Sequence, residues 1–313
     1  MRHVFINELI KQSKKDKDIY LITADLGFKA FEKFHREFPE RFINLGVAEN
    51  NMIGVGAGMA LQGKKVFVYS ILPFVTFRSL EQIRNNICHN NLNVKLVGGG
   101  GGFSYSVQGI SHNTSEDLSV MRSLPNMSVY NPGSKIEAEI ATQKLFDTDG
   151  PGFIRLGKAP EDDYYKEKPK YKLGDGLLIQ NGDDLTIFCS GNITKVVMDA
   201  ASKLKNQKIN AKIVSMLCLK PINSKFVVSQ IKSKNVVTVE EHSEVGGLGS
   251  AIADILMSSN LGGNISFKKI ALSDRSHKEI GSQDYLRKLN SLDSNSIVKN
   301  IINLIKKDKN RKK

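Results

Sequence analysis

Hydrophobic residues along the first half of the chain follow two patterns that alternate, helical spacing and short apolar runs. Apolar positions at helical spacing predict helices over residues 2–15, 50–62, about 75–89 and 134–145. Short apolar runs between them predict buried strands over residues 18–23, 65–69, 93–97, 127–130 and 152–156. Helices that alternate with buried strands favour an α/β fold whose sheets are mainly parallel.

The composition changes after this first block. Residues 159–172 contain two prolines and few aliphatic side chains, a composition that predicts a linker. A second α/β block follows, with strands expected at 185–188, 211–215, 235–239 and 265–271 and helices at about 193–205, 223–232 and 248–259. We therefore predict two α/β domains, residues 1–158 and 181–313, joined by a linker over residues 159–180.

The bulk composition is that of a soluble globular protein. With 313 residues, 40% of them hydrophobic and 25% charged, the chain is long enough for two domains that each bury a core. It contains no run of about 18 apolar residues, so we expect no membrane span. Glu8 interrupts the segment where a secretion signal needs its apolar centre. Cys88, Cys189 and Cys218 form no metal-binding spacing, which favours reduced thiols and a cytoplasmic location.

The positive net charge does not by itself indicate a nucleic-acid-binding protein. The net charge of +13 is spread along the chain, apart from a dense run over Lys306–Lys313 that we expect to be a solvated tail. No zinc finger or aromatic RNA-binding pattern accompanies the charge, so we expect no nucleic-acid partner. A positive field would also suit a phosphorylated substrate.

The run from Asn44 to Ala60 (NLGVAENNMIGVGAGMA) carries the strongest chemical signal. It places the carboxylate of Glu49 at the start of an apolar, glycine-rich helix. On its own, such a carboxylate can be a helix N-terminal charge that contributes about 0.3–1 kcal/mol. Gly54, Gly56 and Gly58 each cost a helix about 1 kcal/mol, which suggests a close approach to another element, such as a second helix across an interface.

This run resembles the thiamine-diphosphate segment of transketolases. Matching stretches extend from near Asp25 to near Lys158 and continue through the second block. The resemblance implies a pyrimidine-binding domain followed by a transketolase C-terminal-like domain. It also implies that Glu49 is the catalytic acid that hydrogen-bonds the cofactor's aminopyrimidine ring. That carboxyl group must hold a proton near neutral pH, which burial favours.

A second segment, Ser70 to Arg78, follows a predicted strand and opens a helix. Aromatic residues here can simply pack in the core. The resemblance implies instead that they line the aminopyrimidine, where stacking supplies area and a specific geometry. Phe74 matches the stacking residue best, and Phe77 is the second candidate. Arg78 lies at the same edge and could serve the cofactor or the substrate.

The segment after the third predicted strand begins with five consecutive glycines, Gly98–Gly102. No Gly-Lys-Ser/Thr follows them, so we expect a mobile loop and not a phosphate-binding P-loop. The later part, from Gly109 to Met127, resembles transketolases and deoxyxylulose-phosphate synthases, which implies a catalytic and substrate-binding role for His112. Transketolases usually carry an aspartate where this chain has Gln108. An amide can bind a sugar hydroxyl but offers no charge, so the sugar preference stays open.

The remaining candidates carry weaker signals. The resemblance aligns Lys158 with a basic residue that contacts the substrate phosphate, while Arg155 is expected to be structural. Asp25 matches a cofactor-side segment, but it can equally be a turn aspartate. The run Thr238–Ala253 resembles the family's C-terminal domain, which mainly supports dimerisation. Taken alone, the glycines at its helix start suggest anion binding.

One expected part of a thiamine-diphosphate site has no match. The magnesium-diphosphate motif is Gly-Asp-Gly at the end of an apolar strand, followed by an asparagine some 25–30 residues later. Gly174-Asp175-Gly176 and Asn206 have this spacing, but the strand is predicted after the motif and not before it. We therefore assign this chain no metal ligands, although carboxylate and amide oxygens are what Mg²⁺ prefers.

The chain therefore resembles the C-terminal subunit of a split transketolase. The resemblance implies an N-terminal partner subunit that supplies the diphosphate and Mg²⁺ site, an α₂β₂ assembly, and transfer of a two-carbon ketol unit from a ketose, expected as its phosphate, to an aldose. One alternative is the beta subunit of a 2-oxo-acid dehydrogenase, which shares the glutamate. Another is a non-catalytic assembly subunit, since fold alone does not prove activity.

Overall fold

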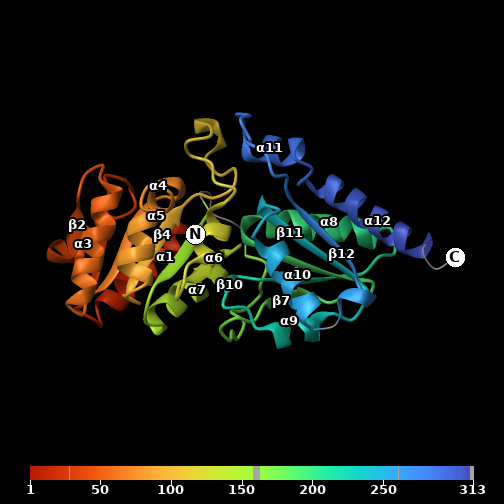
Figure 1. Cartoon of the computed structure of the whole chain (residues 1–313), viewed down its shortest axis with the longest axis horizontal. Helices are drawn as coiled ribbons and strands as arrows, with labels where there is room; N and C mark the ends of the chain where they lie inside the picture. The colour runs from red at the N-terminus through yellow and green to blue at the C-terminus, as the bar shows by residue number, and fades with distance from the viewer. Residues whose placement is uncertain (28, 158–162, 260, 311–313) are drawn as a thin grey trace.

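The chain folds into two α/β domains that lie side by side along its long axis (Figure 1). The computed structural model describes residues 1–27, 29–157, 163–259 and 261–310. The first domain contains, in chain order, α1 (Arg2–Ser13), β1 (Ile19–Thr23), α2 (Glu32–Glu37), η1 (Pro39–Arg41), β2 (Phe42–Asn44), α3 (Glu49–Leu61), β3 (Lys65–Ile71), α4 (Leu72–Thr76), α5 (Leu80–Gln82), η2 (Ile83–Cys88), β4 (Val94–Gly99), η3 (Ser106–Gln108), α6 (Asp117–Ser123), β5 (Ser128–Tyr130), α7 (Lys135–Asp147) and β6 (Gly152–Leu156).

The second domain continues the same alternation. Its elements are β7 (Leu177–Gln180), β8 (Leu185–Ser190), η4 (Gly191–Ile193), α8 (Thr194–Lys205), β9 (Ala211–Ser215), β10 (Cys218–Lys220), α9 (Ser224–Gln230), β11 (Asn235–Ser243), α10 (Leu248–Ser258), η5 (Gly262–Asn264), β12 (Ser266–Leu272), α11 (Gln283–Leu289) and α12 (Ser294–Asn310). The predicted α/β class with two mainly parallel sheets is confirmed.

The first sheet has the order β10-β5-β6-β4-β3-β1-β2, and its strands are parallel except for β10. Successive residues of β3 point to opposite faces, as the pleat requires. Val66 and Val68 pack against the α3 side, while Phe67 and Tyr69 pack against the α1 and α7 side. Both faces are therefore covered by helices, which explains why these strands are hydrophobic without alternation.

The predicted helix over residues 75–89 is wrong in its continuity. The chain instead forms α4, a break at residues 77–79, the short α5 and the π-helical segment η2. Apolar periodicity runs through all of these residues, so the sequence pattern did not reveal the break. The break matters because Phe77 and Arg78 lie in it and face a cavity.

The second sheet has the order β12-β11-β8-β9-β7, with β7 antiparallel to β9. Residues 177–180, which the composition placed in the linker, form β7 and are thus part of this sheet. The sequence analysis did not predict α11 or α12. Helix α12 extends to Asn310, so the basic run that we expected to be a solvated tail begins inside a helix.

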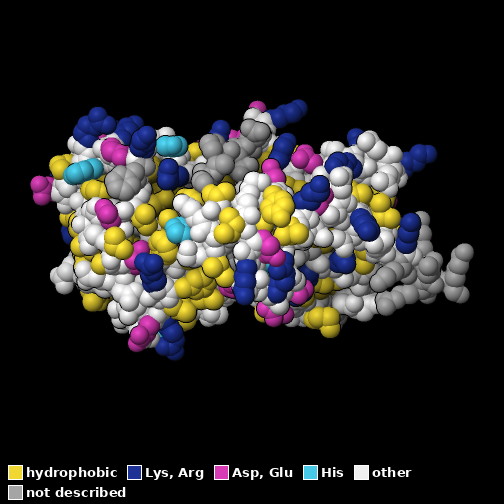
Figure 2. Space-filling model, turned by 90° about the horizontal axis from the view of Figure 1, so that it is seen from above, with side chains coloured by type: hydrophobic (Ala, Val, Ile, Leu, Met, Phe, Trp, Pro, Cys, Tyr) yellow, Lys and Arg dark blue, Asp and Glu magenta, His cyan; other side chains and the backbone are white. Residues whose placement is uncertain are grey.

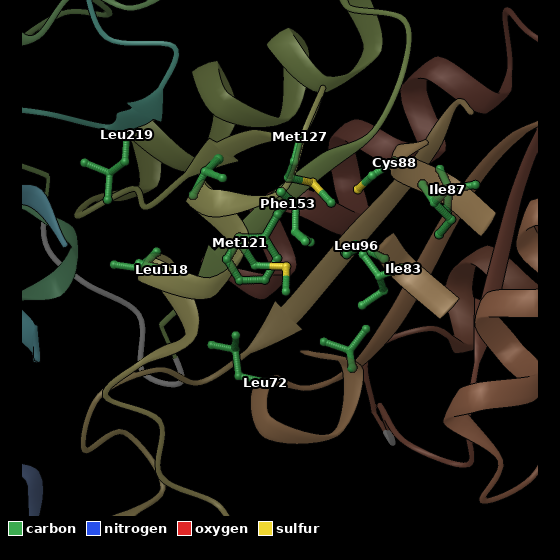
Figure 3. Close-up of a cluster of buried hydrophobic side chains, with 14 of the residues drawn as sticks. Leu72, Ile83, Ile87, Cys88, Leu96, Leu118, Met121, Met127, Phe153 and Leu219 are labelled. Atoms are coloured by element: carbon green, nitrogen blue, oxygen red, sulfur yellow. The ribbon is translucent and has the colours of Figure 1, made fainter. Parts of the chain in front are cut away.

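The two domains share a strand and a core. Although β10 follows β9 in the chain, it pairs antiparallel with β5 in the first sheet. Leu219 of β10 is buried among Leu118, Met121 and Phe153 of the first domain (Figure 3). The same buried cluster extends to Phe188 in the second sheet. This continuous core fixes how the domains sit on each other.

The described part of the linker is also packed. The hydroxyls of Tyr164 and Tyr165 donate hydrogen bonds to the carboxylate of Glu137 in α7, at 2.9 and 2.7 Å. Burial raises the pKa of Glu137, and the amide of Gly133 donates to the same carboxyl group. The linker therefore runs back along the first domain and is not a free tether.

The distribution of charged side chains on the surface bears on whether a nucleic acid is a partner. Lysine and arginine side chains are spread over both halves of the face seen in Figure 2 and are interspersed with acidic side chains, with no single dense basic patch on that face. Across the described residues, no helix is both long and apolar enough to cross a membrane.

Candidate active site

Glu49 is the first residue of α3, and its side chain is buried although it ends in a carboxyl group. Its exposed fraction is 4%. The hydroxyl of Ser70, at the end of β3, lies 3.4 Å from Oε1, and Nη1 of Arg78 donates to Oε2 at 3.2 Å. The fold therefore brings the helix start after β2 next to the segment after β3, because these strands end at the same edge of the sheet.

The aromatic and basic candidates contact each other beside Glu49. The guanidinium group of Arg78 lies 4.1 Å above the ring of Phe74, in a cation–π geometry. The ring of His112 meets the ring of Phe74 edge-on, with centroids 5.1 Å apart. The hydroxyl of Ser111 is hydrogen-bonded to Nδ1 of His112 at 3.0 Å. Three segments far apart in sequence thus meet at one place.

A cavity of about 410 Å³ opens at this cluster. Its volume suits a small-molecule site. The lining residues come from the segment after β3, the loop after β4 and the loop after β12; they are Pro73, Phe74, Phe77, Arg78, Gly102, Phe103, Ile110, Ser111, Asn113, Thr114, Ser115, Glu116, Ser276 and His277.

The five-glycine run does not form the open, mobile loop that the sequence suggested. Gly98 and Gly99 end β4, and the whole run is buried. Gly100, Gly101 and Gly102 have positive φ values, so side chains there would be strained. A Cβ on Gly101 would also meet Arg155, and one on Gly102 would meet Glu241. Glycine is needed here because neighbouring side chains occupy the space.

A second cavity lies against the same glycine run. It has a volume of about 340 Å³ and is lined by Arg2, Tyr69, Gly99, Gly100, Tyr105, Leu156 and Gly157. Burial raises the pKa of Tyr105, so its hydroxyl stays protonated and able to donate. A guanidinium group and phenol hydroxyls together offer donors to an anionic or hydroxylated group.

Of the eight predicted site residues, Phe74, Phe77 and Arg78 line the main cavity, whereas Glu49 and His112 contact Arg78 and Phe74 and are not among the lining residues. The other three lie elsewhere or outside the described residues. Gln108 is exposed and is not among the lining residues. Asp25 has a φ of 54°, its amide donates to Oδ1 of Asn44 at 2.9 Å, and it borders a separate cavity of about 170 Å³. That geometry fits a turn residue, and a cofactor role for Asp25 stays a prediction. Lys158 lies outside the described residues.

Sequence reasoning missed three residues that the fold brings to the cavities. Phe103 and His277 line the main cavity, and their rings meet edge-on with centroids 5.7 Å apart. Arg2 lines the second cavity although it lies at the start of the chain. No local pattern marked them, because His277 follows the last strand of the other domain and only the domain packing places it here.

The two candidate binding motifs of the second block are hydrogen-bonded to groups within the protein. The first amides of α10, at Leu248 and Gly249, donate to the carboxylate of Glu240, both at 2.7 Å. The helix start is thus occupied by an internal anion, and the anion-binding interpretation of these glycines is wrong. In the Gly-Asp-Gly motif, Asp175 accepts a hydrogen bond from Nδ2 of Asn223 at 2.7 Å and precedes β7.

Comparison with known protein families agrees with this geometry. Residues 1–160 match the transketolase pyrimidine-binding domain, and residues 174–297 match the transketolase C-terminal domain. The chain therefore belongs to the transketolase family.

Individual relatives narrow the assignment. The chain is 37% identical to a putative transketolase C-terminal section of Methanocaldococcus jannaschii, over 98% of this chain and 97% of that one. It is 34% identical to a 6-deoxy-6-sulfo-D-fructose transketolase subunit of Clostridium sp. (strain MSTE9), over 96% and 92%. A solved structure described as a split-gene transketolase, inactive beta4 tetramer, superposes with a TM-score of 0.88 at 32% identity, covering 97% and 98%.

These matches identify a C-terminal subunit of a split transketolase, which is a transferase. They do not favour the alternative of a 2-oxo-acid dehydrogenase subunit. The pyrimidine-binding domain implies thiamine diphosphate as the cofactor, and the split organisation implies a separate N-terminal partner.

Proposed function

We propose that this chain supplies the pyrimidine half of a thiamine-diphosphate site in a cytoplasmic α₂β₂ split transketolase. The N-terminal partner subunit provides the diphosphate and Mg²⁺ half. Together the two chains transfer a two-carbon ketol unit from a ketose, in particular a ketose phosphate, to an aldose. The observation that carries this proposal is the buried carboxyl group of Glu49, which is bonded to Arg78, whose guanidinium lies over the ring of Phe74 on the wall of the main cavity.

The residues present fit an aminopyrimidine ring. Such a ring offers a flat apolar face and a polar edge, and Phe74 and Phe77 provide apolar faces on the cavity wall. Glu49 provides a buried carboxyl group to which a polar ring edge can hydrogen-bond. The half-exposed side chain of Arg78 now covers the ring of Phe74. Its long stem allows it to move aside for a stacked ring and to remain at the site edge.

Each side chain has a defined task in this proposal. When bound, thiamine diphosphate supplies the electron sink for breaking the carbon–carbon bond beside a ketose carbonyl. The carboxyl group of Glu49 holds and exchanges a proton with the pyrimidine ring. His112, which Ser111 orients through Nδ1, hydrogen-bonds substrate hydroxyls and moves their protons.

The second cavity supports an anionic substrate end. Arg2 supplies the charge there, and Tyr69 and Tyr105 supply hydroxyl donors. Lys158 is the further phosphate candidate, and Gln108 is the candidate contact to a sugar hydroxyl.

The split organisation of the relatives supports a partner for the diphosphate half. Among the described residues, no group of three or more His, Cys, Asp or Glu side chains is arranged to hold a metal ion. The carboxylate of Asp175, in the one Gly-Asp-Gly motif, is already bonded to Asn223.

Calorimetry of thiamine diphosphate with Mg²⁺ tests this proposal directly. We expect no tight binding to this chain alone and tight binding to its mixture with the N-terminal subunit. Tight binding to the isolated chain would contradict the split site. A mixture that forms a complex but binds no cofactor would contradict the assignment of the pyrimidine half.

A substitution tests the role of Glu49. In the complex with the partner, Glu49→Gln should lower ketol transfer by about 10²-fold or more, the usual range for a lost acid–base group. The matched control is Glu81→Gln, which neutralises an exposed acid in α5, three residues after Arg78, and should leave turnover unchanged. A Glu49→Gln complex with wild-type turnover would favour a non-catalytic assembly subunit.

A further inference from the structure

Glu241, in β11 of the second domain, makes an unusual set of contacts with the first domain. Its exposed fraction is 2%, and its Oε1 accepts a hydrogen bond from the backbone amide of Phe103 at 2.7 Å. Gln283 donates to the same oxygen at 2.8 Å, and Nε of Arg287 donates to Oε2 at 2.5 Å. A Cβ on Gly102 would lie 2.2 Å from this carboxylate, so the backbone approaches it as closely as glycine permits.

Phe103 begins the loop that lines the main cavity and carries His112, residues 103–116. A second buried charge holds the far end of this loop, because Nη2 of Arg155 donates to the carbonyl of Thr114 at 3.2 Å. Arg155 also donates to the backbone carbonyl of Glu241 at 3.2 Å. The loop is therefore fastened at both ends to side chains near β11, and between them it contains only the short η3.

A third contact lies beside the first two. The hydroxyl of Ser106 donates to the carbonyl of Gly281 at 2.6 Å, and the ring of Phe103 meets that of His277. In Figure 1 this loop and the segment around α11 project side by side from the same edge of the molecule. The second domain thus forms one wall of the loop.

We propose that Glu241 is a positioning residue for the active-site loop, residues 103–116. The C-terminal domain then takes part in catalysis by fixing the position of His112. This inference rests on the proposed function, in which His112 contacts the substrate. Glu241 itself does not line the cavity and does not contact the proposed cofactor residues.

The physical reason lies in the cost of unpaired buried groups. A carboxylate that accepts from an amide makes a stronger bond than a neutral acceptor does. Removing its charge takes from the guanidinium of Arg287, which is 8% exposed, its buried counter-ion and leaves it only the exposed Asp284 at 3.7 Å. The amide of Phe103 then loses its charged acceptor, and the loop gains freedom at the end nearest the cavity.

The chain offers a matched control in the adjacent residue. Glu240 is 1% exposed and accepts two backbone amides, but these belong to α10 within its own domain. Glu240→Gln and Glu241→Gln are therefore the same change in equally buried carboxylates, and only Glu241 is bonded to the cavity loop. Gln283→Met, which removes one donor to Glu241 from a half-buried position, serves if Glu241→Gln does not fold.

Amide hydrogen exchange of the full-length chain tests the contact itself. With Glu241→Gln we expect exchange across residues 103–116 to become about tenfold faster or more, because the opening of this segment no longer breaks a charged hydrogen bond. Glu240→Gln should instead speed exchange at the start of α10. Equal effects of the two variants on the loop, or no effect of either, would overturn the proposal.

Kinetics of the complex with the partner subunit test the consequence. With D-xylulose 5-phosphate as donor and D-ribose 5-phosphate as acceptor, Glu241→Gln should raise the KM of the donor about tenfold or more, the scale of a misplaced contact. The dissociation constant of thiamine diphosphate should stay within about twofold, because its proposed ligands lie on other segments. A variant that is merely less stable loses active enzyme and leaves KM unchanged, which would overturn the positioning role.

The two proposals fail in different ways. If the wild-type complex neither binds thiamine diphosphate nor transfers a ketol unit, the proposed function is wrong, and the positioning role of Glu241 in catalysis is wrong with it. Hydrogen exchange still reports whether Glu241 holds the loop over residues 103–116. If the wild-type complex is active and Glu241→Gln changes exchange but not KM, only the positioning inference is overturned.

Discussion

The buried ion pair between Arg155 and Asp117 joins β6 of the first sheet to the start of α6. Nη2 of Arg155 donates to Oδ1 of Asp117 at 3.1 Å, and Nε lies 3.0 Å from Oδ2. The side chains are 5% and 0% exposed. The perturbation we consider is Asp117→Asn, which keeps the shape of the side chain and removes its charge.

The expected magnitude follows from this geometry. Two charges at about 3 Å attract by about 5 kcal/mol at an effective dielectric constant of 20. Removing one partner of a buried pair usually costs about 3–5 kcal/mol, because the remaining charge stays buried without a counter-ion. The pair also supports the cavity, since the guanidinium of Arg155 bonds the carbonyl of Thr114. We therefore expect Asp117→Asn to lower the free energy of unfolding by about 3–5 kcal/mol.

Urea unfolding followed by far-ultraviolet circular dichroism measures this loss. With a slope of about 3 kcal/mol per molar urea, the midpoint should fall by about 1–1.7 M. The control is Asp147→Asn, which removes a surface pair with Lys144 whose acidic side chain is 60% exposed. That change should cost less than about 1 kcal/mol. An Asp117→Asn midpoint no lower than that of the control would refute the reasoning, and a double-mutant cycle with Arg155→Met would report the coupling directly.

Two further stability predictions concern single buried residues. Burial lowers the pKa of Lys95 from 10.5 to about 8, so between these values the unfolded chain binds a proton that the folded chain lacks. The free energy of unfolding should then rise with pH over this window, by up to about 3 kcal/mol relative to Lys95→Met; a constant difference between the two proteins from about pH 7.5 to 10 would contradict this. Phe153 is fully buried at the centre of the shared core (Figure 3). Phe153→Ala should cost about 3–5 kcal/mol in urea unfolding, and a loss below about 1 kcal/mol would mean that the core refills the cavity.

Local pattern in the sequence determined much of the fold. Short apolar runs predicted β3 and most of the other strands, and helical spacing predicted α3 and most of the longer helices, because each of these elements buries residues that its own sequence encodes. The resemblance carried by the run around Glu49 and by the segment after Gly109 led to the transketolase family. It also named Glu49, Phe74, Arg78 and His112, which the structure brings together.

Pairings between distant segments were decided only by the tertiary structure. The three-residue β10 carries no pattern that could show it joins the first sheet, and apolar periodicity continued through the break that exposes Phe77. The burial of the glycine run and the arrival of His277 and Glu241 at the active-site loop depend on how the two domains pack. Sequence periodicity reports which face of an element is buried, but not what it is buried against, because that choice is made by contacts between residues far apart in the chain.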